Sequence, residues 1–206
     1  MIKILAIIFM LIDHIGYVFF SDWTFLRVIG RLALPLFAYG ITQGYIRTRN
    51  VKMYFFRLLI LALVSQIPYN YALNTGYYNV VFTLCMGLII LIVIESKINT
   101  IVKSLICLIV FFICDVFYFE YGIYCLLLIL NFYKFRNNYS KLISGQLVIT
   151  VFGVIVYNYQ LYQFVSILAV PIIMASQLKD FKLPKVIGYG FYPIHLIFIY
   201  YFLTIS

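Results

Sequence analysis

Long apolar segments follow one another along almost the whole chain, and they limit its fold more than any other feature. We place them at residues 2–20, 26–46, 53–72, 78–95, 99–118, 121–133, 141–158, 160–178 and 186–204. A helix crosses the hydrocarbon core of a bilayer with about 20 residues. The connections between the segments are too short to hold a soluble domain. The sequence therefore predicts an all-α, polytopic transmembrane helical bundle of about nine spans, forming a single domain over residues 1–206. The sixth segment is short for a full crossing and is also compatible with a re-entrant helix.

The composition agrees with a location in the cell membrane. Hydrophobic residues make up 66% of the chain and charged residues only 10%, a balance that a soluble domain of this length does not have. A net charge of +9 can indicate a nucleic-acid partner. Here the basic residues lie in short connections between apolar segments, which is typical of the positive-inside rule. We therefore expect the lipid bilayer as a partner and no nucleic acid.

The basic residues also predict the orientation. With nine spans, twelve of them fall on one side: Lys3, Arg47, Arg49, Lys52, Lys97, Lys103, Lys134, Arg136, Lys141, Lys179, Lys182 and Lys185. The other side receives Arg27 together with Asp22, Asp115 and Glu120. The positive-inside rule then places the N-terminus in the cytoplasm and the C-terminus outside. Eight spans would break this alternation.

The cysteines give no indication of a metal or redox site. They are Cys85, Cys107, Cys114 and Cys125, all in apolar segments and none with C-x-x-C or C-x-x-H spacing. We interpret them as small core residues, with a buried nucleophilic cysteine as the alternative. The first apolar segment is too long for a cleavable signal, contains an acid and a histidine, and lacks a small-residue cleavage site.

The stretch around Asp13 and His14 is the strongest candidate for a functional site. Both residues lie deep in the first apolar segment, where an Asp costs about 2.5–3.5 kcal/mol even on the mildest insertion scale. Such residues usually face a protein interior or a wet cavity. On a helix the two side chains point about 100° apart, so we do not expect them to pair with each other. Asp13 shares a face with Tyr17, four residues later. The alternative is a polar pair that only fixes helix packing.

Arg31 is the natural counter-ion of Asp13. It lies between Gly30, which permits close helix approach, and Pro35, which kinks a helix. The connection between the first two segments is short, so these segments are expected to be neighbours. Both residues lie in the outer halves of their segments, and we predict a buried ion pair between them.

Two further polar stretches stand out. Ser65 and Gln66 precede Pro68 near the end of the third segment, where a broken helix end could line a cavity or form an ordinary terminus. The last segment contains Tyr192, Pro193 and His195, the only histidine besides His14. A functional role for His195 and a simple hydrogen-bonded core histidine are both compatible with this pattern.

Four blocks of sequence together resemble the TraX family of membrane proteins. They are Leu11–Gly16 (LIDHIG), Leu26–Ala38 (LRVIGRLALPLFA) with Gly44-Tyr45 and Thr48–Asn50, Arg57–Leu59 with Ser65–Pro68, and Tyr192–Leu196 (YPIHL). The first two are specific, and the others are weak alone. The chain departs from the family at Gln66, where an acidic residue is expected.

The resemblance implies a membrane-bound, acetyl-CoA-dependent acetyltransferase. TraX proteins are associated with acetylation of the N-terminus of pilin subunits, so the acceptor is expected to be a pilin-like peptide or another envelope molecule with an amine or hydroxyl group. Larger membrane acyltransferases that the family resembles use a histidine in the first span with acyl-CoA.

The residues fit this chemistry. A histidine is the usual base for acetyl transfer, and we assign this role to His14, with Asp13, Arg31 and His195 as further catalytic candidates. Acetyl-CoA is anionic and cytosolic, so Arg47, Arg49, Lys52 and Arg57 are candidates for binding its phosphates, although topology alone or snorkelling would also explain them. Candidates for lining the substrate site are Tyr17, Ser65, Gln66 and Tyr192. We expect no resident metal.

Two other functions remain open at this stage. A small proton-coupled transporter could use Asp13, His14, Arg31 and His195 as a relay, although no inverted repeat is evident. A non-catalytic assembly factor of an envelope complex is the other alternative. Binding of acetyl-CoA would separate the enzyme from both.

Overall fold

The computed structural model describes the backbone of residues 1–176 and 185–205, and the side chains of residues 1–175 and 188–205. The expected cytoplasmic residues Lys179, Asp180 and Lys182 lie outside this part of the chain. The helices are α1 (Ile2–Val18), α2 (Thr24–Gly30), α3 (Ala33–Arg47), α4 (Val51–Leu73), α5 (Val80–Glu95), α6 (Thr100–Val116), α7 (Gly122–Lys134), α8 (Tyr139–Val156), the 3-10 helix η1 (Leu161–Leu168), α9 (Ala169–Ser176) and α10 (Lys185–Ile205). The described part of the chain is thus all-α, as predicted.

The helices coincide with the predicted apolar segments, with two clear differences. The eighth segment divides into the 3-10 helix η1 and α9. The second segment is not one helix, because a turn at Arg31 and Leu32 separates α2 from α3. The proline expected to kink it, Pro35, lies in the first turn of α3, where its missing N–H has no helical partner to lose.

Four helical stretches in the described residues are long and apolar enough to cross a membrane: Thr24–Arg47, Val51–Leu73, Tyr139–Val156 and Gly188–Ile205. These stretches and the apolar composition indicate a membrane protein. The count of nine spans and the cytoplasmic N-terminus stay predictions.

Asparagine defines the start of several helices. Asn50, Asn79, Asn99 and Asn138 each accept a hydrogen bond from a backbone N–H in the first turn of α4, α5, α6 and α8, at 2.8–3.1 Å. A side-chain oxygen at this position satisfies one of the donors that a helix start leaves free. The sequence thereby fixes where four of the polar connections end.

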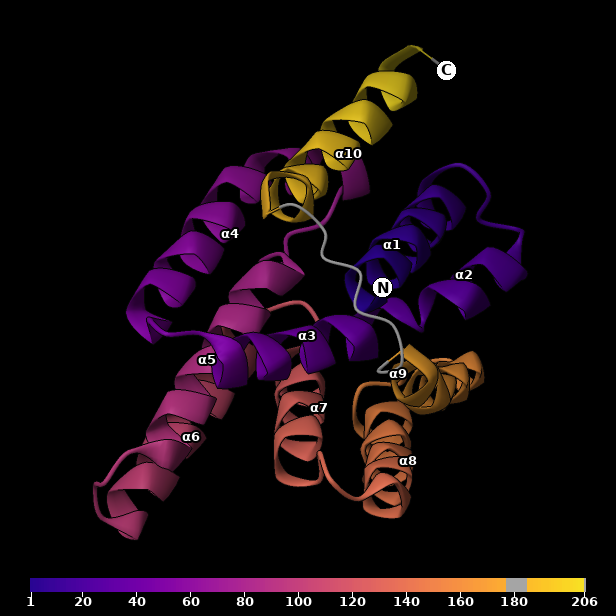
Figure 1. The fold of residues 1–206 in the computed structure, drawn as a ribbon. Helices are drawn as coiled ribbons and strands as arrows, with labels where there is room; N and C mark the ends of the chain where they lie inside the picture. Colours follow the sequence, from indigo (N-terminus) through magenta and orange to yellow (C-terminus); the bar gives the residue numbers. More distant parts are fainter. Residues whose placement is uncertain (177–184, 206) are drawn as a thin grey trace.

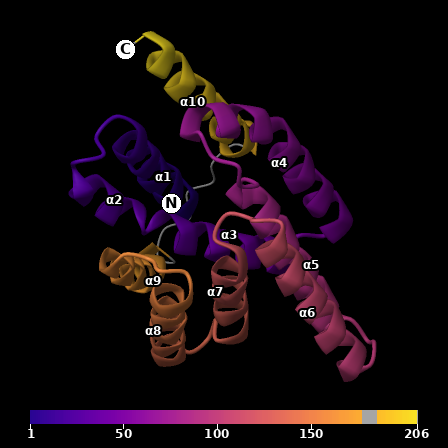
Figure 2. The same ribbon diagram turned by 180° about the vertical axis from the view of Figure 1, so that it is seen from behind.

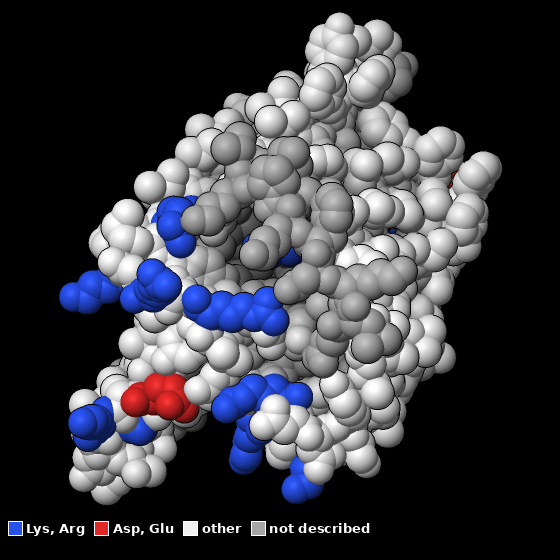
Figure 3. Space-filling model, viewed as in Figure 1, with Lys and Arg blue, Asp and Glu red and all other residues white. Residues whose placement is uncertain are grey.

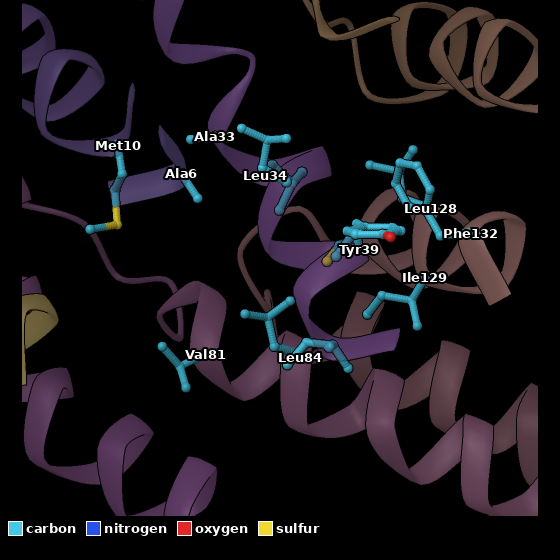
Figure 4. Packing of buried hydrophobic residues seen from close by; sticks show 14 of the residues in the cluster. Ala6, Met10, Ala33, Leu34, Tyr39, Val81, Leu84, Leu128, Ile129 and Phe132 are labelled. Carbon is cyan, nitrogen blue, oxygen red and sulfur yellow. The ribbon is translucent and has the colours of Figure 1, made fainter. Parts of the chain in front are cut away.

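The core lies where α3 crosses the other helices. Figure 1 shows α3 running across the middle of the molecule, and it contacts α1, α5 and α7. Tyr39 of α3 packs edge-on against Phe132 of α7 with ring centroids 5.8 Å apart, next to Leu84 and Ile129 (Figure 4). On one side of this core α10 lies against α4, while α5 and α6 project on the other, as the reverse view also shows (Figure 2).

Candidate functional site

The Asp13 carboxylate lies between two arginines of the next helix. Its Oδ1 is 2.9 Å from Arg31 Nη2, and its Oδ2 is 2.8 Å from Arg27 Nη1. Asp13 and Arg31 are buried, so the predicted ion pair between α1 and the end of α2 is confirmed. Arg27 is a second partner that the sequence analysis had placed only in the outer connection. Two cations around one carboxylate leave this cluster with a net positive charge.

The local sequence explains this geometry. Arg27 and Arg31 are four residues apart, so both project from the same face of α2 toward α1. Gly30 lies between the two arginines in the sequence, where α2 contacts α1. A Cβ built at this position would be only 2.1 Å from Asp13 Oδ1. A glycine is therefore required for the carboxylate to lie against the backbone of α2.

Arg31 uses its three kinds of donor within the protein. Besides its bond to Asp13, its Nε donates to the carbonyl of Arg27 at 3.2 Å, and its Nη1 donates to the Tyr121 hydroxyl at 3.3 Å. Its guanidinium also lies 5.7 Å from the centre of the Tyr162 ring. Arg31 thus connects α1, α2, the start of α7 and η1, which gives it a positioning role.

The two histidines meet across the first and last helices. His14 Nδ1 is 2.9 Å from His195 Nε2, both residues are buried, and the two rings are nearly parallel, with an interplanar angle of 12°. His195 Nδ1 lies 2.9 Å from the carbonyl oxygen of Phe191. Both histidines are candidates from the sequence, but their contact is not evident from it.

The carbonyl sets the direction of the hydrogen bonds in this pair. A carbonyl oxygen can only accept, so His195 must carry its proton on Nδ1 and, when neutral, offers the lone pair of Nε2. His14 then donates from Nδ1 to His195, and its own Nε2 holds a free lone pair. That nitrogen has no hydrogen-bond partner among the described residues, and His14 lines a large cavity.

The cavity lies on the Asp13 side of α1 and has a volume of about 700 Å³. Its wall combines charged groups with an unusual number of tyrosines, listed here in chain order: Asp13, His14, Tyr17, Arg27, Tyr69, Tyr77, Asp115, Tyr118, Glu120, Tyr121, Tyr157 and Tyr159. Arg27 comes from α2, and the others come from the ends of α1, α4, α6 and α8 and from the connections that follow these helices. This volume lies within the range of small-molecule sites in proteins.

Glu120 is the acidic residue of the connection between α6 and α7. Its carboxylate accepts a hydrogen bond from the backbone N–H of Val80 at 3.0 Å and another from the Tyr69 hydroxyl. Burial of the carboxyl raises the pKa of Glu120 to about 7, against the opposing effect of these donors. The cavity therefore contains an acid that can change its charge near neutral pH.

The other predicted lining residues have different positions. Tyr17 lines the cavity, as expected. Tyr192 is 94% buried against His195, with ring centroids 5.6 Å apart, and its hydroxyl has no hydrogen-bond partner among the described residues. Ser65 and Gln66 do not line the cavity. α4 also continues through Pro68, so the broken helix end expected there is wrong.

Gln66 has a structural task instead. Its side-chain oxygen accepts from the backbone N–H of Asn79 at 3.0 Å, and its amide donates to the Tyr77 carbonyl at 3.0 Å. It thereby fixes the connection between α4 and α5, which also carries one tyrosine of the cavity wall. An amide supplies the donor and the acceptor that this arrangement needs, whereas a carboxylate could only accept.

Several of the described basic residues gather on one face of the molecule, around a smaller acidic group (Figure 3). Figure 3 shows Lys and Arg side chains over the ends of α3, α4 and the helices below them. Arg47, Arg49 and Lys52 are exposed around the α3–α4 connection. Arg57 is half-buried one turn into α4, and its Nε has no hydrogen-bond partner among the described residues. The group can present positive charge to an anion at this end of the molecule.

A family model described as "TraX protein" matches residues 1–203. A protein of Dichelobacter nodosus named "Probable fimbrial assembly protein FimC, serogroup H1" is 33% identical over 141 residues, which cover 60% of this chain and 56% of that protein. An uncharacterised protein of Rickettsia prowazekii (strain Madrid E) is 29% identical over 87 residues, or 42% of this chain and 34% of that protein. The aligned parts therefore span about half or less of these relatives. No solved structure matches the chain significantly.

Proposed function

The chain belongs to the TraX family, and from this premise we propose that it is an integral membrane acetyltransferase that moves an acetyl group from acetyl-CoA to an amine or hydroxyl acceptor. The acceptor is a pilin-like peptide N-terminus or another molecule of the cell envelope. The name of the Dichelobacter relative, a fimbrial assembly protein, is compatible with an acceptor of this kind.

The main support for the proposal is the direction of the hydrogen bond between the two histidines. The lone pair of His14 Nε2 is available in a residue that lines the cavity, while His195 and the Phe191 carbonyl hold the ring and its tautomer. A second group that orients the base through its other nitrogen is the usual arrangement around a catalytic histidine. Acetyl transfer needs such a base because the acceptor must lose a proton as it attacks.

The proposed reaction proceeds by direct transfer. The acceptor nitrogen or oxygen bonds to the thioester carbonyl carbon while His14 Nε2 takes the acceptor's proton. The tetrahedral intermediate then collapses, the C–S bond breaks, and the CoA thiolate leaves with the proton that His14 returns. The products are the acetylated acceptor and free CoA.

Tyr192 is the candidate donor to the oxyanion of this intermediate. Its hydroxyl is buried without a partner among the described residues, and the centroid of its ring lies 5.6 Å from that of the His195 ring. A buried, unpaired donor is held in place at a free-energy cost that a bound oxyanion would offset. Arg31 is less suited, because its donors are already used by Asp13, Tyr121 and the Arg27 carbonyl.

The donor is proposed to bind from the cytoplasmic face. Acetyl-CoA carries several negative charges, and Arg47, Arg49, Lys52 and Arg57 place cationic groups around the α3–α4 connection. Arg57 is a particularly suitable phosphate ligand, because its Nε–H donates no hydrogen bond to any described residue. The proposed mechanism uses no metal ion.

A non-catalytic role in fimbrial assembly is the second candidate, and the name of the Dichelobacter relative favours it. The two functions differ in their use of acetyl-CoA. We would purify the protein in lipid vesicles, add acetyl-CoA labelled in the acetyl group, and measure CoA release and labelled products from envelope extracts. The enzyme transfers label and loses this activity in His14→Ala. Absence of both binding and transfer would leave only the assembly role.

A further inference from the structure

A second, separate hollow reaches the histidine pair from outside the bundle. It is a groove of about 390 Å³ between α1 and α10. Leu11, Ile15 and Phe19 line it from α1, at a spacing of four residues, and five apolar side chains line it from α10. Among the described residues, His195 is the one polar side chain in its wall. The groove thus lies on the opposite face of α1 from Asp13 and Tyr17.

The exposed wall of this groove is apolar, as expected for a surface that faces the hydrocarbon of a membrane. The segment Gly188–Ile205 is one of the four candidate spans. Three of its groove residues are more than half exposed at the surface of the protein: Ile194, Phe198 and Phe202 at 51%, 59% and 58%. Water would be a poor occupant for a hollow with such a wall, whereas lipid chains surround it on the exposed side.

The size of the groove favours a chain over a helix as its occupant. One turn of an α-helix with its side chains is about 10–12 Å wide and 5.4 Å long, which is on the order of 500 Å³. The groove is smaller than this one turn. An extended alkyl chain has no backbone polar groups to satisfy and can follow a narrow apolar surface.

The groove and the polar cavity meet at one hydrogen bond. His195 lines the groove, His14 lines the cavity, and 2.9 Å separates their bonded nitrogens. The ring of Phe191 is stacked on His195 at 5.1 Å and continues the apolar wall to this point. A molecule with an alkyl chain in the groove would therefore have its other end at His195, one hydrogen bond away from the candidate base.

We propose that the α1–α10 groove binds the alkyl chain of a membrane amphiphile whose polar headgroup is the acetyl acceptor. This inference rests on the proposed acetyltransferase function and narrows its acceptor to lipid-anchored amines or alcohols. Moving a chain from bilayer to groove exchanges one apolar surrounding for another, so it adds little affinity. Its contribution is to hold the headgroup beside the histidine pair, as expected for a positioning site.

Two isoleucines of α10 allow a matched test. Ile194 lines the groove, whereas Ile197 is similarly exposed, at 55%, but does not line it. Ile194→Trp would fill the groove, and Ile197→Trp adds the same bulk beside it. The full chain is reconstituted in phospholipid vesicles with acetyl-CoA and acceptors that share one headgroup but carry a long or a short alkyl chain.

We expect Ile194→Trp to reduce transfer to the long-chain acceptor about tenfold or more, a change of about 1.4 kcal/mol. The rate at which Ile194→Trp acetylates the short-chain acceptor should equal that of the parent. Ile197→Trp should acetylate both acceptors at the parent's rates. An unchanged preference for chain length in Ile194→Trp, or an equal loss in Ile197→Trp, would overturn the proposal.

Direct labelling separates this proposal from the proposed function. A long-chain acceptor with a photoactivatable alkyl chain should label peptides of α1 and α10 in the parent and in His14→Ala, but not in Ile194→Trp. Such labelling without transfer in the parent would reject the acetyltransferase and keep a lipid site. If ordinary phospholipid displaces the probe as well as unlabelled acceptor does, the groove binds bulk lipid and the acceptor site is refuted.

Discussion

His14 Nδ1 donates a hydrogen bond of 2.9 Å to His195 Nε2, across 181 residues of sequence. This bond joins the first helix to the last and fixes the tautomers of both rings, because the Phe191 carbonyl accepts the remaining proton of His195. The histidine nearer to the cavity keeps an unshared lone pair. In the proposed mechanism the two histidines therefore have different tasks. His14 is the base, and His195 orients it.

His14→Ala is expected to abolish acetyl transfer. Loss of a general base commonly reduces the rate by about 10²–10⁴, and this base acts in the transition state. The variant should still fold and bind acetyl-CoA, because the proposed phosphate ligands lie at the other end of the bundle. Transfer within about threefold of the parent, measured with labelled acetyl-CoA, would refute this assignment.

Substitutions of His195 test its orienting task separately. His195→Ala should be less damaging than His14→Ala, because the base itself remains. His195→Gln should recover part of the loss, since the glutamine oxygen can accept the proton of His14 Nδ1. The pattern is wrong if His195→Ala alone is inactive, in which case the roles of the two histidines are exchanged. Equal activity of the Ala and Gln variants would contradict the orienting bond.

Asp13→Asn is expected to destabilise the protein more than removal of either arginine. Breaking a buried ion pair typically costs about 3–5 kcal/mol because the remaining charge is uncompensated. Here Asp13→Asn leaves two arginines facing each other. Arg31→Gln should be more harmful than Arg27→Gln, since the Arg31 side chain is 9% exposed and that of Arg27 is 21% exposed. Unfolding of the detergent-solubilised variants measures these differences.

A double-mutant cycle then isolates the Asp13–Arg31 interaction. The double variant Asp13→Asn with Arg31→Gln should be more stable than the sum of the two single losses predicts, because contacting charges couple. Strict additivity would contradict the pair. The cycle with Arg27→Gln is a useful comparison, and its coupling should be smaller because Arg27 is more exposed.

Much of the fold follows from the sequence for physical reasons. Apolar segments interrupted by polar connections give the helices, and capping asparagines such as Asn50 and Asn138 define their starts. The Asp13–Arg31 pair was also predictable, because two opposite charges at similar depth in neighbouring apolar segments have few other partners. Arg27 was missed since its place near a helix end suggested solvent rather than a carboxylate.

The cavity wall could not be predicted in the same way. It is assembled from connections that are distant in sequence, and local pattern does not show which of them meet. Glu120 and Tyr121 had no distinguishing neighbours beyond a run of aromatic residues, and twenty tyrosines in the chain leave any single one without a signal. The prediction for Gln66 failed because a polar residue before a proline is equally suited to fixing a connection.

Gly30→Ala is expected to destabilise the site, with Gly40→Ala as a matched control in α3. A Cβ at Gly30 would lie 2.1 Å from Asp13 Oδ1, so α2 must move away from α1. Overpacking of this kind typically costs about 1–3 kcal/mol. A Cβ at Gly40 meets nothing within 4 Å, and alanine there should stabilise the helix by about 0.5–1 kcal/mol. The same sign for both variants in thermal unfolding would contradict the close contact at Asp13.

The predicted topology is testable with single cysteines in a background without the native ones. The exposed positions Arg49 and Asn138 should be cytoplasmic, and Asp22 and Asn158 should be outside. In intact cells an impermeant thiol reagent should therefore label the second pair alone, and all four after permeabilisation. Labelling of position 49 from outside would reject the nine-span orientation.

Glu120 should make stability depend on pH in an unusual direction. Its pKa is raised to about 7 in the folded protein by burial, from 4.5 for an ordinary glutamate. The folded state therefore holds this proton more tightly than the unfolded state does. The resulting stabilisation is complete below pH 4.5 and is lost as the pH rises through about 7, with a slope on the order of 1 kcal/mol per pH unit between the two values.

Glu120→Gln stays neutral but still offers an acceptor to the Val80 N–H. The difference in unfolding temperature between parent and Glu120→Gln should thus shift in favour of the variant from pH 5 to pH 8. A difference that stays constant over this range would show that Glu120 titrates as an ordinary surface acid.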